Sequence, residues 1–227
     1  DPAREIPLTW SPSCHIEDLR VFTRGQGPAA DAYVPAGEGL IVGTVRMGFG
    51  HHRIARSVYT WSQALGHTTY LHDLLAIDSP EADAIRAMDA SYSRASRISS
   101  NLGGPFEWLW GKLMQQGGPG SLRTSLMLAE AIAPLMKGIP RDIPVISSYP
   151  LNGQIAVALG FERVINLVID NHPQHFILVP GALNLVQGPA WHDRFLSMGV
   201  PERHLRVAGH WVSEPLASHA VKTSREA

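Results

Sequence analysis

The sequence lacks the features that assign a chain to several large classes of protein. Its single cysteine, Cys14, cannot form an intramolecular disulfide, which is typical of a reducing compartment. A formal net charge of −1 leaves no overall field that would attract nucleic acid. No apolar run approaches the roughly 20 residues that span a bilayer, and residues 1–10 have neither the basic nor the apolar region of a signal peptide. We therefore expect a cytoplasmic protein without a transmembrane helix.

Several catalytic and ligand-binding motifs are also missing. There is no G-x-S-x-G nucleophile elbow, which argues against an α/β hydrolase. The segment Gly48-Phe49-Gly50 lacks the third glycine of the dinucleotide fingerprint and the Gly-Lys-Ser/Thr of a phosphate-binding P-loop, so we expect neither NAD binding nor a P-loop. With no cysteine pair and no H-x-x-x-H, we also expect no metal site.

What the sequence does contain is an alternation of strand and helix patterns, with 44% apolar residues, which is ample for a buried core. Residues 39–65 combine a β-branched apolar run, the G-x-G turn and a helical pattern, and residues 67–73 form a second strand. This is the βαβ unit of a parallel sheet. The alternation resumes later, with strands expected at 143–147, 163–169, 182–186 and 205–208 and helices at 152–159 and 189–198.

The pattern predicts one α/β domain with a doubly wound parallel sheet, Rossmann-like, over residues 39–215. Residues 79–137 carry little strand signal and are expected to be a helical insertion after the second strand. Residues 1–38 are rich in Pro, Gly and Ala and are expected to form an irregular arm, with one short strand near 19–23 that adds an edge strand to the sheet. Residues 216–227 are expected to be a linker or tail.

His51 is the first candidate for chemistry. The carboxyl ends of parallel strands meet at one edge of the sheet, and His51 follows the first of them. Glycines 48 and 50 allow a ligand to approach the backbone closely, and the helix N-terminus lowers the pKa of a nearby imidazole. A neutral imidazole can remove a proton from a hydroxyl. The alternative is that His51 only caps or hydrogen-bonds the loop.

Other polar residues at the strand ends can also be explained by purely structural roles. His52 fits a structural or solvent-facing role, and Asp73 could simply cap the turn after its strand. Asp170, His172 and His175 look at first like metal ligands, but contact with a polar ligand fits the sequence better.

A further feature is the apolar face of the stretch at residues 105–114, which includes Phe106, Trp108 and Trp110. Packing against the sheet is the default interpretation of such a face. The functional interpretation is contact with a membrane surface, because Trp favours the boundary between lipid and water.

Four short motifs occur along the chain. They are Gly48-Phe49-Gly50-His51, Ser148-Tyr149-Pro150, Val168-Ile169-Asp170 with His175, and Met198-Gly199-Val200-Pro201 with Val207-Ala208-Gly209. In these motifs the chain from residue 39 to about 215 resembles the N-terminal, acceptor-binding domain of GT-B fold glycosyltransferases, in particular monogalactosyldiacylglycerol synthase and processive diacylglycerol glucosyltransferases. The motifs are similar, in this order, to the family's G-G-G-H loop, its Thr-His-Pro-like strand end, its V-T-D loop, and its last helix and strand. Phe49 and Ile169 depart from the family pattern, and Trp211 stands where the interdomain linker normally has Pro.

The resemblance implies a membrane-associated transferase that moves a hexosyl group from a nucleotide sugar, such as a UDP-sugar, to a hydroxyl acceptor that can be lipid-linked. By this resemblance His51 is the general base or contacts the acceptor hydroxyl, and residues 105–114 contact the inner face of the membrane peripherally. The C-terminal domain of the family binds the donor, and the sequence given ends at Ala227, so we expect no activity from this chain by itself. Independently of the resemblance, the meeting of the strand ends at one edge of the sheet groups the candidate substrate-binding residues Gly48, Phe49, Gly50, His52, Asp73, Tyr149, Asp170, His172 and His175. The resemblance implies that Gly48 and Gly50 shape the cleft that faces the donor diphosphate and that Asp170 and His175 line the acceptor side.

Two alternatives from other classes fit the same sequence. One is a binding or scaffold module that keeps half of the GT-B fold and has lost the chemistry. The other is an enzyme like the sugar-nucleotide epimerases, which share a doubly wound plan with two domains.

Overall fold

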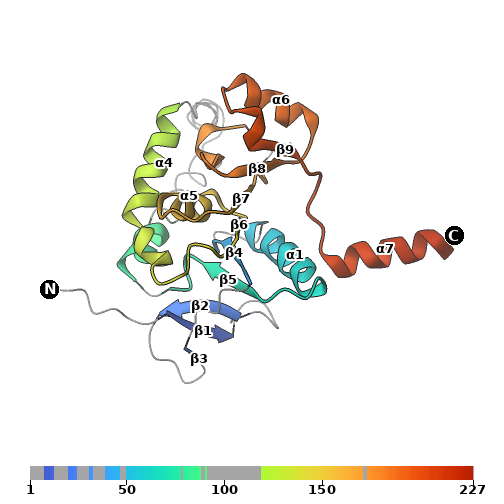
Figure 1. The fold of residues 1–227 in the computed structure, drawn as a ribbon, viewed down its shortest axis with the longest axis horizontal. Coiled ribbons are helices and arrows are strands. Elements are labelled where there is room, and N and C mark those ends of the chain that lie inside the picture. The colour runs from blue at the N-terminus through green and yellow to red at the C-terminus, as the bar shows by residue number, and fades with distance from the viewer. Residues whose placement is uncertain are drawn as a thin grey trace, which may run out of the picture.

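The computed structural model describes residues 8–12, 20–24, 31–32, 39–46, 50–77, 79–87, 90, 119–170 and 173–226. Over these residues the chain forms one nine-stranded sheet in the order β3-β1-β2-β5-β4-β6-β7-β8-β9 (Figure 1). The seven strands from β2 to β9 in this order are parallel, and helices flank the sheet. The predicted doubly wound α/β fold is confirmed.

The central strands and helices lie within a few residues of their predicted positions. Each helix that links two of the later strands ends at a glycine with positive φ, Gly160 after α5 and Gly199 after α6, as is typical of helix C-termini. The strands are β4 (Leu40–Thr44), β5 (Thr69–Asp73), β6 (Val145–Ser147), β7 (Val164–Leu167), β8 (Leu183–Val186) and β9 (Leu205–Val207). The helices are α1 (Gly50–Ala64), α4 (Pro119–Ala131), α5 (Pro150–Ala158), α6 (Pro189–Ser197) and α7 (Glu214–Glu226), with short 3₁₀ turns η1 (Ala133–Met136), η2 (His175–Ile177) and η3 (Glu202–His204).

The N-terminal arm contributes more to the sheet than its composition suggests. It contains β1 (Leu8–Pro12), β2 (Arg20–Arg24) and β3 (Asp31–Ala32). The strand β2 lies inside the sheet, parallel to β5, and only β1 and β3 extend the edge. Phe22 of β2 is fully buried and stacks on Tyr70, with ring centroids 5.4 Å apart. The arm therefore closes one side of the core.

The C-terminal residues, expected to be a linker or tail, form the helix α7. Its N-terminal end lies beside α1, and the rest extends away from the sheet (Figure 1). The indole Nε1–H of Trp61 donates to the carbonyl of Val212 at 2.8 Å, and the N–H of Glu214 donates to the hydroxyl of Thr60 at 3.1 Å. These two bonds attach the segment before α7 to the outer face of α1.

The helix α5 packs unusually close to the sheet. A Cβ placed on Gly43 would lie 2.6 Å from the Cβ of Asn152, and one placed on Gly153 would lie 2.8 Å from a methyl group of Val179. Neither position has a positive φ, so the requirement is for space and not for backbone conformation. The contact fixes the first turn of α5 against the end of β4.

The crossover connections diverge between β4 and β6. The chain leaves β4 through α1 toward β5 and leaves β6 through α5 toward β7, in opposite directions across the sheet. Because such crossovers are right-handed, α1 and α5 lie on opposite faces. Ligands of open α/β sheets bind at such a switch point, beyond the carboxyl ends of the strands.

We expect the substitution Gly43→Ala to destabilise the protein by about 1–3 kcal/mol, because the added methyl group would overpack the contact with Asn152. Thermal or urea unfolding measures the effect. The matched control is Gly120→Ala in α4, where an added Cβ meets nothing within 4 Å and should be neutral or stabilising by up to about 1 kcal/mol. Equal stability of both variants would contradict the close-packing argument.

Candidate functional site

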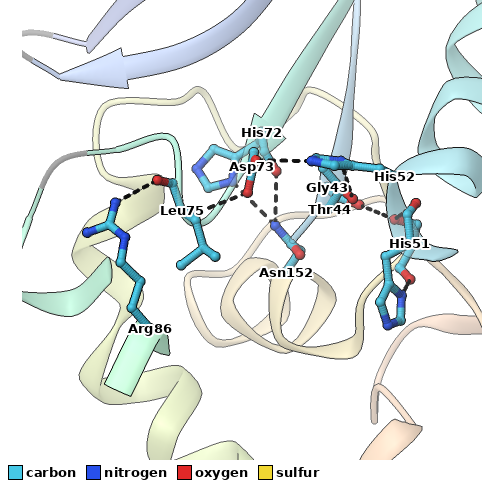
Figure 2. A network of polar contacts seen from close by, with 10 residues as sticks. Gly43, Thr44, His51, His52, His72, Asp73, Leu75, Arg86 and Asn152 are labelled. Atoms are coloured by element: carbon cyan, nitrogen blue, oxygen red, sulfur yellow. Dashed lines mark hydrogen bonds and ion pairs between the residues drawn. The ribbon is translucent and has the colours of Figure 1, made fainter. Parts of the chain in front are cut away.

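His51 lies in the first turn of α1, at the switch point. Its Nδ1 is 2.7 Å from the carbonyl oxygen of Ser148, the residue after β6. A carbonyl only accepts hydrogen bonds, so Nδ1 carries the proton and Nε2 of the neutral ring carries the lone pair. In Figure 2 the ring points away from the buried polar network that contains His52. The arrangement fixes the tautomer that a general base requires.

Ser148 is itself anchored to the neighbouring strand. Its N–H donates to the carbonyl of Gly43 at 2.8 Å. Its hydroxyl lies 3.0 Å from the same carbonyl and 3.1 Å from the carbonyl of His51, and it donates to one of them at a time. The position of the imidazole is therefore determined by β4, β6 and α1 together.

The surroundings of His51 lower its pKa below the ordinary value of 6.5. Burial is the largest cause, because it removes water from the charged form. The hydrogen bond to Ser148 and the negative charge of Asp170 act in the opposite direction, and His52 adds to the lowering. The net result is an imidazole that is neutral at pH 7 and can accept a proton.

Tyr149 packs edge-on against His51. The two ring centroids are 4.9 Å apart and the planes meet at 76°, an arrangement that aromatic pairs favour. Tyr149 immediately precedes α5, so the pair joins the first turn of α1 to the N-terminal end of α5. The contact restricts rotation of the imidazole about its side-chain bonds.

His51 lines a cavity with a volume of about 790 Å³ on the α1 side of the sheet. Arg53 and Arg56 bring positive charge from α1, and Asp170 brings negative charge from the end of β7. Gln187, at the end of β8, donates from Nε2 to the carbonyl of Ile169 at 3.0 Å. The full lining consists of Gly50, His51, Arg53, Ile54, Arg56, Ser57, Thr60, Ile169, Asp170, Gln187, His210, Trp211, Val212, Ser213, Pro215 and Leu216.

His52 and Asp73 lie behind this cavity and do not line it. Nε2 of His52 is 3.3 Å from a carboxylate oxygen of Asp73, and its Nδ1 is 3.3 Å from the hydroxyl of Thr44 (Figure 2). The other carboxylate oxygen of Asp73 accepts the N–H of Leu75 at 3.0 Å. All three polar side chains are buried, so they tie the first turn of α1 to the ends of β4 and β5.

The remaining predicted site residues differ in whether they lie at the cavity. Gly50 and Asp170 line the cavity with His51, and Tyr149 contacts the His51 ring. His175 begins η2, which packs against α4, and it does not line the cavity. Gly48, Phe49 and His172, and the proposed membrane residues Phe106, Trp108 and Trp110, lie outside the described residues.

Within the described residues no group of three or more His, Cys, Asp and Glu side chains could hold a metal ion. In the same part of the chain, none of the helices has the length and apolar character needed to cross a bilayer.

The sequence interpretation missed Arg53, Arg56, Gln187 and the segment at residues 210–216. The arginines could have been found, because a helix that starts at Gly50 places residues at spacings of three on one face. Residues 210–216 have no comparable signal. Their place at the cavity depends on the hydrogen bonds from Trp61 to Val212 and from Glu214 to Thr60, which are tertiary contacts.

A family model described as a domain of unknown function, DUF6937, matches residues 10–195. The chain belongs to the DUF6937 family. Neither the curated proteins nor the solved structures contain a match to the chain. The DUF6937 match includes His51, Ser148 and Asp170 but not residues 210–216. His51 and the carbonyl that it bonds to thus lie within the matched residues, while one wall of the cavity lies beyond the match.

We expect the lowered pKa of His51 to make stability depend on pH. The unfolded chain protonates this imidazole near pH 6.5 and the folded chain only at lower pH, so the unfolded state binds more protons in between. The stability associated with the neutral His51 imidazole is therefore fully present above pH 6.5, and the free energy of unfolding decreases as the pH falls below this value. Urea unfolding of the wild type and of His51→Asn between pH 5 and 8 should show a steeper loss on acidification in the wild type. Identical pH profiles would contradict a lowered pKa.

Proposed function

We propose that this chain is the acceptor-binding half of a glycosyltransferase-like protein, with His51 as the general base. The observation that carries the proposal is the state of the imidazole. Its Nδ1–H is held by the Ser148 carbonyl, its pKa is lowered, and it lines a polar cavity at the switch point of the sheet. An unprotonated Nε2 at such a place suits the removal of a proton from a hydroxyl.

In the proposed reaction, the acceptor hydroxyl gives its proton to Nε2 of His51 as its oxygen attacks the anomeric carbon of a nucleotide sugar. The bond from this carbon to the diphosphate oxygen breaks, the configuration inverts, and the nucleoside diphosphate leaves with the bonding electrons. Asp170 favours the imidazolium that forms, since its charge acts to raise the pKa of His51. Arg53 and Arg56 line the same cavity and add positive charge where a diphosphate would approach.

The nucleotide sugar, a UDP-sugar in the proposal, is bound by a separate donor-binding domain. The support for this division is the resemblance of the motifs around His51, Tyr149 and Asp170 to the acceptor half of the GT-B fold. The position of His51 beside the switch point between β4 and β6, where open α/β sheets bind ligands, is compatible with an acceptor site. Peripheral contact of residues 105–114 with a membrane stays a prediction.

We expect His51→Gln to lower kcat/KM for sugar transfer by about 10²–10⁴-fold, the usual contribution of a general base. The assay uses the chain together with its donor-binding domain, a UDP-sugar and a hydroxyl acceptor. The matched control is His192→Gln on α6, because His192 does not line the cavity.

Three outcomes separate the candidate functions in this assay. Unchanged transfer in His51→Gln would remove His51 from catalysis. Absence of transfer by the wild type would favour a binding module. Formation of an epimerised sugar nucleotide in place of a glycoside would favour an epimerase-like enzyme.

We also expect UDP-N-acetylglucosamine to leave the melting temperature of the 227-residue chain nearly unchanged. The same ligand should raise the melting temperature when the donor-binding domain is joined to the chain, because a ligand stabilises only the folded unit that binds it. Differential scanning fluorimetry over a range of ligand concentrations makes the measurement. A large shift for the 227-residue chain would contradict the proposed division of labour.

A further inference from the structure

A second cavity, with a volume of about 590 Å³, lies between α1, β6 and the segment before α7. Four residues line both cavities, namely Ser57, His210, Trp211 and Val212. The two spaces therefore adjoin and follow α1 from His51 toward Leu65. The complete lining of the second is Leu40, Ser57, Val58, Trp61, Ser62, Leu65, His67, Ile146, His210, Trp211, Val212 and Ala217.

The second cavity presents mostly carbon atoms to its interior. Leu40, Val58 and Ile146 supply apolar side chains from the strands and from α1. Several polar groups in its wall already have partners within the protein. The Ser57 hydroxyl donates to the carbonyl of Arg53 at 3.0 Å, and the Ser62 hydroxyl pairs with Thr69 at 2.5 Å. A ligand in this space would gain stability mainly from burial of apolar surface.

Exposed apolar side chains gather at the same place. Of the seven large hydrophobic side chains that are exposed among the described residues, four line one or both cavities. They are Trp61, Leu65, Val212 and Leu216, with exposed fractions of 43%, 69%, 41% and 59%. Contiguous exposed apolar surface of this kind is typical of a binding site.

We propose that the second cavity binds the unbranched hydrocarbon chain of an acceptor whose hydroxyl reaches His51 in the first cavity. The inference depends on the proposed function only for the role of the acceptor hydroxyl at His51. The span from His51 to Leu65 along α1 is roughly 20 Å, so a ligand that fills both spaces must be long. It must also be polar at one end, facing Arg53 and Asp170, and apolar at the other.

The first experiment measures binding of n-alkyl β-glucosides with chains of six to ten carbons by isothermal titration calorimetry, below the concentrations at which they form micelles. These probes are uncharged and carry hydroxyls at one end. Each added CH₂ should tighten Kd by about threefold to fourfold, as expected for a methylene that leaves water. A Kd that does not depend on chain length would overturn the inference.

Matched variants show where the hydrocarbon chain of the glucoside binds. Leu65→Ser removes an exposed apolar side chain from the cavity wall and should weaken binding of the decyl glucoside by roughly tenfold. Met127→Ser, which removes a similarly exposed side chain from α4, should leave binding unchanged. Ala217→Phe, which places a ring at the cavity, should abolish the dependence on chain length. Equal effects of Leu65→Ser and Met127→Ser on binding would show that the hydrocarbon chains bind elsewhere on the protein.

Two controls keep this inference separable from the proposed function. His192→Gln on α6, which lines neither cavity, should retain binding of the decyl glucoside, whether or not the wild type transfers a sugar. Transfer to hexyl and decyl acceptors with equal kcat/KM would leave the transferase function supported and reject the apolar chain site. Self-association of the wild type that Leu65→Ser abolishes would also reject it, because a second copy would then cover the apolar surface.

Discussion

The hydrogen bond from Nδ1–H of His51 to the carbonyl of Ser148 is the interaction on which the candidate site depends. It joins the first turn of α1 to the end of β6, two elements that the chain separates by 97 positions. Without it, the imidazole would have no fixed tautomer, and burial alone would not say which nitrogen faces the cavity. With it, the proton lies on the protein side and the lone pair remains on the other nitrogen.

This bond requires that several elements be held close together. Gly43 leaves room for Asn152 and so lets α5 begin directly over the end of β4. Below α1, His52 contacts Asp73 and Thr44, which end β5 and β4. These contacts involve no part of the cavity, yet they fix the backbone from which His51 extends. Neighbouring histidines thus have different tasks, because successive residues of a helix point in directions about 100° apart.

The sequence predicted the architecture well, since hydrophobic periodicity and helix-ending glycines are local signals. It also placed His51 and Asp170 at the strand ends, because all parallel strands carry their ends to one edge. It did not reveal that β2 lies inside the sheet or that α7 follows β9, because both depend on burial of particular side chains such as Phe22 and on bonds such as that from Trp61 to Val212. His175 shows the same limit. A position soon after a strand end does not determine on which face of the sheet a residue lies.

The two cavities divide the site into a part within the DUF6937 match and a part beyond it. His51, Ser148 and Asp170 belong to the matched residues, whereas Trp211 and Val212, which line both cavities, do not. The unmatched segment is bonded to α1 through side chains at positions 60 and 61, one helical turn beyond Ser57. That segment therefore bounds the space beside α1 through hydrogen bonds that are separate from the one between His51 and Ser148.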